Sequence, residues 1–112
     1  MNLKFTFSLL MLLFSLHSAH SIKCWDCRSD FDPKCGHPFD NSTFPITDCN
    51  FIDTFQGKSK GCRIMKKKEN DIWIYNRSCA PPEEPQFDSE RALCSNSNVE
   101  CHTCYKNGCN SF

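Results

Sequence analysis

The sequence has no excess of either charge and is too short for more than one domain. Its 13 lysine and arginine residues equal its 13 aspartate and glutamate residues in number. A chain without a basic excess is not expected to attract nucleic acid or an anionic membrane by bulk electrostatics. The 112 residues hold one domain at most, and no internal repeat is found. No nucleic-acid partner is therefore predicted.

A recognisable catalytic arrangement is also missing. Only two histidines, His37 and His102, lie beyond the first 21 residues, and each adjoins turn-forming or cysteine-rich sequence. No Ser/His/Asp or Cys/His grouping has a known signature. The acidic pair Glu83-Glu84 lies in a proline-rich stretch, where it is expected to be solvated. We predict that the protein is not an enzyme and has no catalytic residue, cofactor, metal ion or small-molecule substrate.

Long hydrophobic runs are absent except at the N-terminus. The run Phe5–Leu16 follows Lys4 and precedes small residues around Ala19. A run of about 12 residues is too short to cross a bilayer, which needs about 20, but it is typical of a secretory signal peptide. We predict a signal peptide over residues 1–21 and a secreted, extracellular protein. Its mature chain begins at Ile22 and has 12 basic and 13 acidic residues, a formal charge of −1.

Two N-glycosylation sequons agree with export. They are Asn41-Ser42-Thr43 and Asn76-Arg77-Ser78, and neither has proline at its middle position. In an exported chain, we expect at least one of Asn41 and Asn76 to carry a glycan. Asn76 is the weaker candidate, because early disulfide formation at nearby Cys79 could hide it.

Cysteine is the residue type that the chain has in abundance. Ten cysteines in so short a chain indicate a disulfide scaffold if the compartment is oxidising. The Cys-x-x-Cys pairs at 24/27 and 101/104 would also suit a zinc ribbon or a redox motif. Both alternatives expect a reducing compartment and leave the other cysteines unexplained. An even count behind a signal peptide favours five disulfides, whose pairing cannot be deduced by counting.

Both ends of the mature chain carry motifs of a known family. Ile22-Lys23-Cys24-Trp25-Asp26-Cys27 resembles the opening of the Ly6/uPAR three-finger family, and Cys104 to Cys109-Asn110 resembles its closing Cys-x4-Cys-Asn signature. Between them, three pieces are similar to the family's insect quiver/sleepless-type branch. These pieces are Asp32-Pro33-Lys34-Cys35-Gly36, Gly61-Cys62-Arg63 and Arg77-Ser78-Cys79. The resemblance implies a small all-β, disulfide-rich three-finger fold with five disulfides, in one Ly6/uPAR domain over residues 22–112.

The resemblance also implies a cysteine pairing. On the chain-entropy model, each of the two longest links removes about 4 kcal/mol of unfolded-chain entropy and the shortest link about 2 kcal/mol. A domain of this size buries too little apolar surface to be secure without such help. The long bridges are expected to stabilise the hub, and the shortest to shape the terminal loop. The implied pairs are Cys24–Cys62, Cys27–Cys35, Cys49–Cys79, Cys94–Cys101 and Cys104–Cys109.

In this frame, the segments between cysteines become fingers. The β-favouring runs 63–66 and 72–75 flank the polar residues 67–71, which predicts a hairpin in the second finger. Residues 50–61 resemble a linker that leads into this hairpin. In the third finger, the proline-rich stretch 81–85 is expected to be extended and outside any central strand, and residues 88–93 could form one helical turn.

The tip of the second finger is the predicted partner-binding site. One interpretation of its lysine run is a solvated tip whose charge discourages aggregation. The other is a contact surface, because basic and aromatic side chains on a rigid tip suit a receptor with an acidic, aromatic-lined pocket. The candidate residues are Lys66, Lys67, Lys68, Glu69, Asp71 and Trp73.

The family resemblance also implies a function. Quiver/sleepless-type Ly6 proteins are similar to extracellular modulators of potassium channels and nicotinic acetylcholine receptors that act in neuronal excitability, synaptic transmission and sleep. We therefore expect a monomeric, non-enzymatic module that modulates a membrane receptor or ion channel. The alternatives are an epithelial junction, adhesion or surface-protein trafficking factor, and a soluble toxin-like ligand.

The sequence departs from many members of this family after Asn110. Those members continue with a small-residue site, a spacer and an apolar tail of about 10–20 residues that is exchanged for a glycolipid anchor. Here only Ser111 and Phe112 follow. Taken as complete, the sequence predicts a freely secreted protein. A GPI-anchored protein on the outer face of the plasma membrane is expected if the sequence is truncated.

Overall fold

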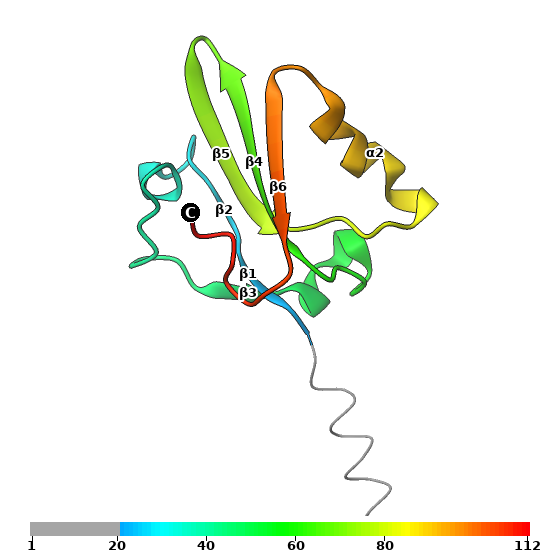
Figure 1. Ribbon diagram of the computed structural model, residues 1–112. Coiled ribbons are helices and arrows are strands. Elements are labelled where there is room, and N and C mark those ends of the chain that lie inside the picture. The colour runs from blue at the N-terminus through cyan, green and yellow to red at the C-terminus, as the bar shows by residue number, and fades with distance from the viewer. Residues whose placement is uncertain (1–20) are drawn as a thin grey trace, which may run out of the picture.

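The computed structural model describes residues 21–112, so the predicted signal peptide lies, except for Ser21, outside the described residues. The described chain forms two antiparallel sheets joined by short turns (Figure 1). One sheet pairs β1 with β3, and the other has the strand order β2-β5-β4-β6. The predicted small, β-rich, disulfide-bonded three-finger class is confirmed. The strands are β1 (Lys23–Trp25), β2 (Cys27–Arg28), β3 (Ile46–Asp48), β4 (Cys62–Glu69), β5 (Ile72–Cys79) and β6 (Val99–Cys104).

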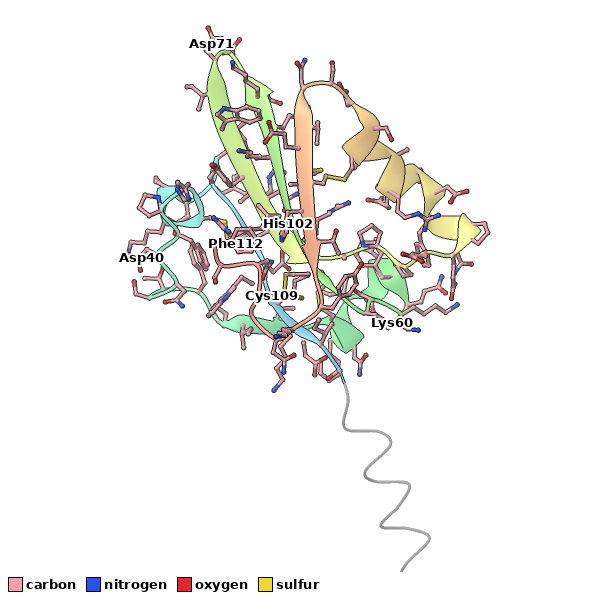
Figure 2. All side chains as sticks on the ribbon, viewed as in Figure 1. Asp40, Lys60, Asp71, His102, Cys109 and Phe112 are labelled. Carbon is pink, nitrogen blue, oxygen red and sulfur yellow. A yellow bond between two sulfur atoms is a disulfide. The ribbon has the colours of Figure 1, made fainter. Side chains whose placement is uncertain are left out.

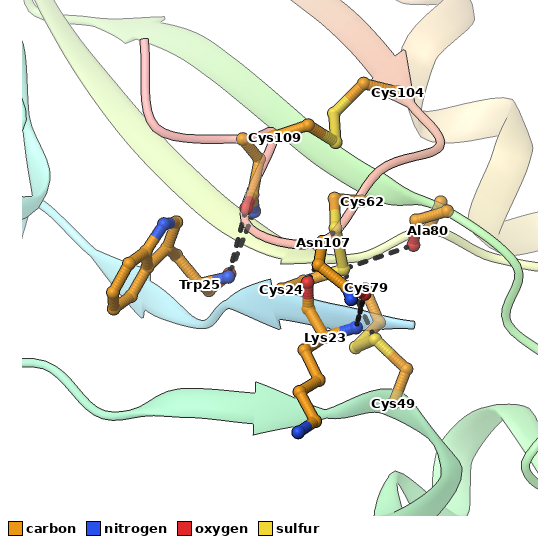
Figure 3. Close-up of a disulfide and its surroundings, with 12 residues drawn as sticks. Lys23, Cys24, Trp25, Cys49, Cys62, Cys79, Ala80, Cys104, Asn107 and Cys109 are labelled. Carbon is orange, nitrogen blue, oxygen red and sulfur yellow. Dashed lines mark hydrogen bonds between the residues drawn. A yellow bond between two sulfur atoms is a disulfide. The ribbon is translucent and has the colours of Figure 1, made fainter. Parts of the chain in front are cut away.

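Five disulfides hold the base of the fingers and close the smaller loops. Four of the buried sulfur atoms form the centre of the hub, where Cys24 Sγ lies 3.3 Å from Cys49 Sγ of the neighbouring bridge (Figure 3). No described cysteine is free. The bridges are Cys24–Cys62, Cys27–Cys35, Cys49–Cys79, Cys94–Cys101 and Cys104–Cys109.

A small aromatic contact extends the hub. The rings of Phe55 and Phe87 meet edge to face with centroids 5.8 Å apart, and both side chains are buried. Phe55 ends the 3-10 helix η3 (Asp53–Phe55), which follows η2 (Cys49–Phe51). Residues 50–61, which resemble a linker in sequence, therefore contribute part of the core.

The second finger is the hairpin β4–β5, paired in register from Cys62 opposite Cys79 to Glu69 opposite Ile72. Its turn is Asn70-Asp71 alone, and both residues have positive φ, 51° and 65°. Two consecutive positive φ values define the type I′ turn, whose twist matches that of the flanking strands. The predicted hairpin is confirmed, but its predicted five-residue loop is wrong. Lys67, Lys68 and Glu69 continue strand β4, because Asn and Asp tolerate the left-handed conformation and close the ladder in two residues.

The first and third fingers combine short helices with single strands. The first finger contains η1 (Pro33–Cys35), which begins directly after Asp32, whose side chain accepts a hydrogen bond from the Lys34 amide. In the third finger, the predicted helical turn is confirmed as α2 (Asp88–Ala92), between η4 (Pro85–Phe87) and η5 (Leu93–Ser95). Strand β6 then returns along β4 and was not predicted. Figure 1 shows the β4–β5 hairpin between the first finger and β6.

Candidate partner-binding surface

Asn110 fixes the base of the second finger. Its side chain is completely buried. Its Oδ1 accepts from the Trp25 amide at 3.0 Å, and its Nδ2 donates to the carbonyls of Trp25, Arg63 and Ser78 at 2.9, 3.3 and 3.4 Å. One amide side chain thus bonds to three segments, β1, β4 and β5. This is the physical reason for an asparagine directly after the last cysteine, since no apolar residue could satisfy these backbone groups.

Arg77 on β5 connects the second finger to the first finger and to the C-terminal segment. The side chain is completely buried. The guanidinium donates to the carbonyls of Cys35, Gly36 and Asn110 at 2.9, 2.7 and 2.9 Å, and to the Phe112 backbone oxygen at 2.6 Å. Its carbon also lies 4.4 Å from the centroid of the Phe39 ring. A fork of charged donors on backbone oxygens compensates for the burial of this cation.

Burial shifts the pKa of both arginines that are removed from solvent. It lowers the pKa of the Arg77 guanidinium, while Tyr75 acts in the opposite direction. Burial also lowers the pKa of the Arg63 guanidinium, and the negative charge of Glu90 partly offsets this lowering. Arg63 Nη1 donates to the Glu90 carbonyl at 3.4 Å, and its buried Nε has no hydrogen-bond partner. These groups position the fingers and are not accessible to a partner.

The hairpin has two different faces. Residues opposite each other in an antiparallel pair share a face, and neighbours along a strand alternate. Lys68 lies opposite Trp73, and Lys66 opposite Tyr75. We call the side that carries these four residues the tryptophan face. We call the other side the isoleucine face; it carries Met65, Lys67, Glu69, Ile72 and Ile74.

This alternation divides the predicted binding site. Lys66, Lys68 and Trp73 lie together on the tryptophan face. Lys67 lies on the isoleucine face, where its ammonium pairs with Glu69 at 3.2 Å. Asp71 occupies the turn at the free end of the hairpin (Figure 2). Lys67, one of the predicted contact residues, therefore does not lie beside Trp73, because the lysine run belongs to a strand and not to a loop.

The tryptophan face presents a cation–aromatic cluster. Lys66 Nζ lies 4.9 Å and Lys68 Nζ 5.9 Å from the centroid of the Trp73 ring. Lys66 also pairs with Glu100 of β6 at 3.1 Å. Lys68 is exposed and forms no ion pair within residues 21–112. The cluster can offer an aromatic surface and one uncompensated positive charge to a partner.

An open cleft of about 330 Å³ continues this face toward the base. Its walls include Ile64, Tyr75 and the two histidines. The His37 ring stacks on Tyr75 at a centroid distance of 6.3 Å, and His102 meets Phe112 at 4.7 Å (Figure 2). Both histidines thus contact aromatic rings beside the cleft.

The remaining sequence candidates lie apart from this cluster. Glu84 of the acidic pair forms an exposed ion pair with Lys58 at 3.0 Å. Asn41 of the first sequon is exposed, and Asn76 of the second is half-buried on β5, opposite Met65. Next to Asn41, the hydrogen bond from the Ser42 amide lowers the pKa of the Asp40 carboxyl. Asn76 therefore projects from the isoleucine face, and a glycan there would leave the tryptophan face uncovered.

Two residues were not recognised from the sequence: Glu100, which pairs with Lys66 on the surface, and Arg77, which is buried beneath it. Glu100 was missed because strand β6 was not predicted, although Val99, Cys101 and Thr103 alternate there with polar residues. Arg77 was noted only within a family-like tripeptide. Residues two apart on a strand point to the same face, so the position of Arg77 two residues after Tyr75 could have placed it on the tryptophan face, at the base of the hairpin.

Over residues 21–112, no helix has the length and apolar character needed to span a bilayer. The model of the Quiver family u-PAR/Ly-6-like domain matches residues 22–110. The UPAR/Ly6 domain-containing protein crok of Drosophila melanogaster is 41% identical over 119 aligned residues, which cover 96% of this chain and 79% of that protein. No solved structure matches the chain significantly.

Proposed function

Because the chain belongs to the Quiver family of u-PAR/Ly-6-like domains, we propose that it modulates a membrane receptor or ion channel from outside the cell. Proteins of this family are generally non-enzymatic, extracellular or cell-surface binding modules. The proposed contact is the tryptophan face of the second finger. The observation that carries this proposal is the cluster of Lys66 and Lys68 over the ring of Trp73.

The chemistry of the cluster suits a protein partner with an acidic, partly apolar site. Tryptophan and cationic side chains contribute strongly when a partner removes water from around them. A lysine held against an aromatic ring keeps its charge while part of its hydration shell is already displaced. The disulfide-bonded hub fixes the base of the hairpin, so little conformational entropy is lost on binding. The cluster therefore has the composition and the rigidity of an interface centre.

Potassium channels and nicotinic acetylcholine receptors are the proposed targets, with roles in neuronal excitability, synaptic transmission and sleep. Both classes present extracellular surfaces that a small secreted or membrane-anchored module can reach. The acidic groups of such a surface would pair with Lys68, which, unlike Lys66 and Lys67 of the same strand, forms no ion pair with another described residue. Modulation here means binding that shifts the receptor's own equilibrium between its states.

The proposal is tested with the mature protein on cultured insect neurons. We expect the combined substitutions Lys66→Gln, Lys68→Gln and Trp73→Ala to weaken cell-surface binding at least about tenfold, since loss of interface-centre residues costs 2 kcal/mol or more in typical scans. Current recordings from cells that express an insect potassium channel or nicotinic receptor provide the functional readout.

The matched control changes the other face of the same hairpin. Lys67→Gln and Glu69→Gln remove the ion pair of the isoleucine face and leave the tryptophan face intact. We expect neuronal binding within about twofold of wild type for this control. If the tryptophan-face variant keeps its five disulfides and binds neurons as well as wild type, the proposed contact is wrong.

A second candidate function, an epithelial junction, adhesion or surface-trafficking factor, is favoured by a different observation. Ile72 is 66% exposed on the isoleucine face, and Leu93 is 48% exposed beside the groove along that face. Exposed apolar side chains on and beside one face of the hairpin suit adhesion to another protein surface. Binding to insect epithelial cells in place of neurons, lost with Ile72→Thr and Leu93→Gln, would support this candidate.

A further inference from the structure

The outer edge of β5 is paired at its base and unpaired near its tip. Strand β2 pairs with β5 only at Arg77 and Asn76. Ser29 then closes the ladder: its amide donates to the Tyr75 carbonyl at 2.9 Å, and its Oγ accepts from the Tyr75 amide at 2.8 Å. Beyond Ser29 the chain turns away from β5, because the amides of Phe31 and Asp32 donate back to the Arg28 carbonyl.

These hydrogen bonds fix the direction of the next backbone groups on β5. The N–H and C=O of Tyr75 point away from β4, toward Ser29. Every second residue of an antiparallel strand points its backbone groups to the same side. The N–H and C=O of Trp73 therefore also point outward, and within residues 21–112 no hydrogen bond to them is found. This edge offers one donor and one acceptor in the spacing that an added strand requires.

An open cleft of about 490 Å³ lies beside this edge. One wall is the backbone and side chains of β5 around Trp73 and Tyr75, and the other is the first finger at Asp30, Pro33 and His37. The cleft continues the line of β2 past the point where that strand leaves the sheet. An extended chain could therefore take the place next to β5 that β2 vacates.

We propose that an extended segment of the partner adds to the sheet as a strand beside β5 and hydrogen-bonds to the backbone of Trp73. The inference rests on the proposed function, because it states how a partner engages the second finger. Side chains of an added strand alternate between the two faces of the sheet. Those on the tryptophan face meet Lys68 and Trp73, and those on the isoleucine face meet Ile72 and Ile74. The matching segment alternates acidic with apolar residues.

The charges favour such a segment over a second copy of this chain. Edge-to-edge pairing of two copies would bring the lysines of both tryptophan faces together, including Lys68, which has no ion pair within the described residues. Like charges at close range oppose such pairing. An acidic segment gains from Lys68, and the two carboxylates that line the cleft, Asp30 and Glu69, are already paired with Arg28 and Lys67.

The test removes one backbone donor and leaves every side chain in place. The mature chain is synthesised with the amide N–H of Trp73 replaced by an ester oxygen, a change on the side of β5 that does not pair with β4. The matched control carries the same replacement at Thr103. Thr103 is exposed on edge strand β6, and its N–H also points outward. The Lys68 amide bonds to the Asn98 carbonyl across the β4–β6 ladder, and bonded and non-bonded pairs alternate from there, so the pair Arg63–Thr103 is a non-bonded one. Disulfide mapping and circular dichroism establish that both variants fold.

The probe is a phage-displayed library of random nonapeptides, selected on the wild-type protein and resynthesised. We expect selected peptides with alternating acidic and apolar residues, about fivefold or more weaker binding to the Trp73 ester, and no change for the Thr103 ester, since one hydrogen bond contributes about 1 kcal/mol. The Trp73 amide of the wild-type protein should also exchange more slowly with deuterium when peptide is bound. Failure to select any peptide, equal binding to both esters, or unchanged exchange of the Trp73 amide would overturn the proposal.

The same two esters are then assayed on insect neurons, which separates this inference from the proposed function. Neuronal binding that depends on the side chains of Lys66, Lys68 and Trp73 but not on the Trp73 amide would overturn strand addition and leave the proposed contact standing. Peptide binding that depends on the Trp73 amide, without any neuronal binding, would support the edge site and refute the proposed function.

Discussion

Arg77 shows how a single residue holds three parts of the molecule together. It extends from β5, and its guanidinium bonds to the first finger at Cys35 and Gly36 and to the C-terminal segment at Asn110 and Phe112. A lysine could place a charge there but not several donors in a fixed plane. Arg77 therefore orients the first finger relative to the second, together with the pairing of β2 with β5.

We expect Arg77→Met to lower the free energy of unfolding by about 2–4 kcal/mol, because it leaves buried carbonyl groups without donors. Arg77→Lys should fall between Arg77→Met and wild type, since it restores fewer of these bonds. The measurement is guanidinium-induced unfolding with the disulfides intact.

The exposed Arg28, which pairs with Asp30 at 2.8 Å, provides the control. Arg28→Met should cost about 1 kcal/mol or less, as is usual for surface ion pairs. Equal effects of the two methionine substitutions would contradict the structural role assigned to Arg77.

Sequence alone located some of these residues but not their contacts. The closing Cys-Asn motif singled out Asn110, and the lysine run singled out Lys66 and Lys68. The division of that run between two faces depends on where the turn begins. The strand and turn propensities of residues 67–71 did not show where the turn begins, since polar residues occur both in exposed strands and in loops. The burial of Arg77 depends on carbonyls about 33 to 42 residues away, which no local pattern encodes.

At the scale of elements, the hairpin turn is a two-residue type I′ turn in which neither residue is glycine. Asp71 has φ of 65°, a conformation that aspartate tolerates but that glycine adopts at a lower steric cost. The pair Asn-Gly is the sequence most favoured for this turn. The pair Asn70-Asp71 at the tip of the second finger is therefore less suited to this turn than Asn-Gly would be.

We expect Asp71→Gly to raise the free energy of unfolding by about 0.5–1 kcal/mol, because glycine adopts positive φ without a steric penalty. Thermal unfolding followed by circular dichroism provides the measurement. Asn70→Gly is the matched control and should change stability by less, since asparagine already suits the first central position. Destabilisation by Asp71→Gly would mean that the Asp71 side chain makes a contact more important than its backbone strain.

Elements with strong local signals were predictable, and those that depend on a neighbour were not. The β-favouring runs on either side of a polar segment predicted β4 and β5. Residues 88–93 predicted the turn of α2. Strand β6 has a weak signal of its own and forms along the edge of β4, where its register is set by the neighbouring strand. The same dependence on a neighbour explains why the linker-like residues 50–61 contribute Phe55 to the hub.

At the scale of the whole molecule, the stability of the domain is concentrated in two bridges. Cys24–Cys62 and Cys49–Cys79 span 38 and 30 residues, whereas Cys104–Cys109 spans 5. The long bridges restrict the unfolded chain more, and they also fill the hub. The cysteine count predicted a disulfide scaffold for this reason, whereas the three-finger fold was implied by the resemblance of the two end motifs to the Ly6/uPAR family.

Paired substitution of each bridge by alanines is expected to separate these contributions. Removing Cys24–Cys62 should cost about 4 kcal/mol and removing Cys104–Cys109 about 2 kcal/mol, from the lengths of the loops that they close. Unfolding with the remaining bridges intact provides the measurement, and peptide mapping without reductant establishes the pairing in each variant. A larger loss from the terminal pair than from the hub pair would contradict this assignment.

The short distance between Cys24 Sγ and Cys49 Sγ also has a consequence for biosynthesis. Loss of Cys62 would leave the Cys24 thiol, and loss of Cys79 the Cys49 thiol, within attacking range of the other bridge, and thiolates exchange with disulfides at such range. Substitution of Cys62 or Cys79 alone should therefore yield a mixture of isomers that exchange partners, whereas removal of both members of a pair should yield one species. Loss of one of these two cysteines alone should therefore disturb folding more than loss of the complete crosslink.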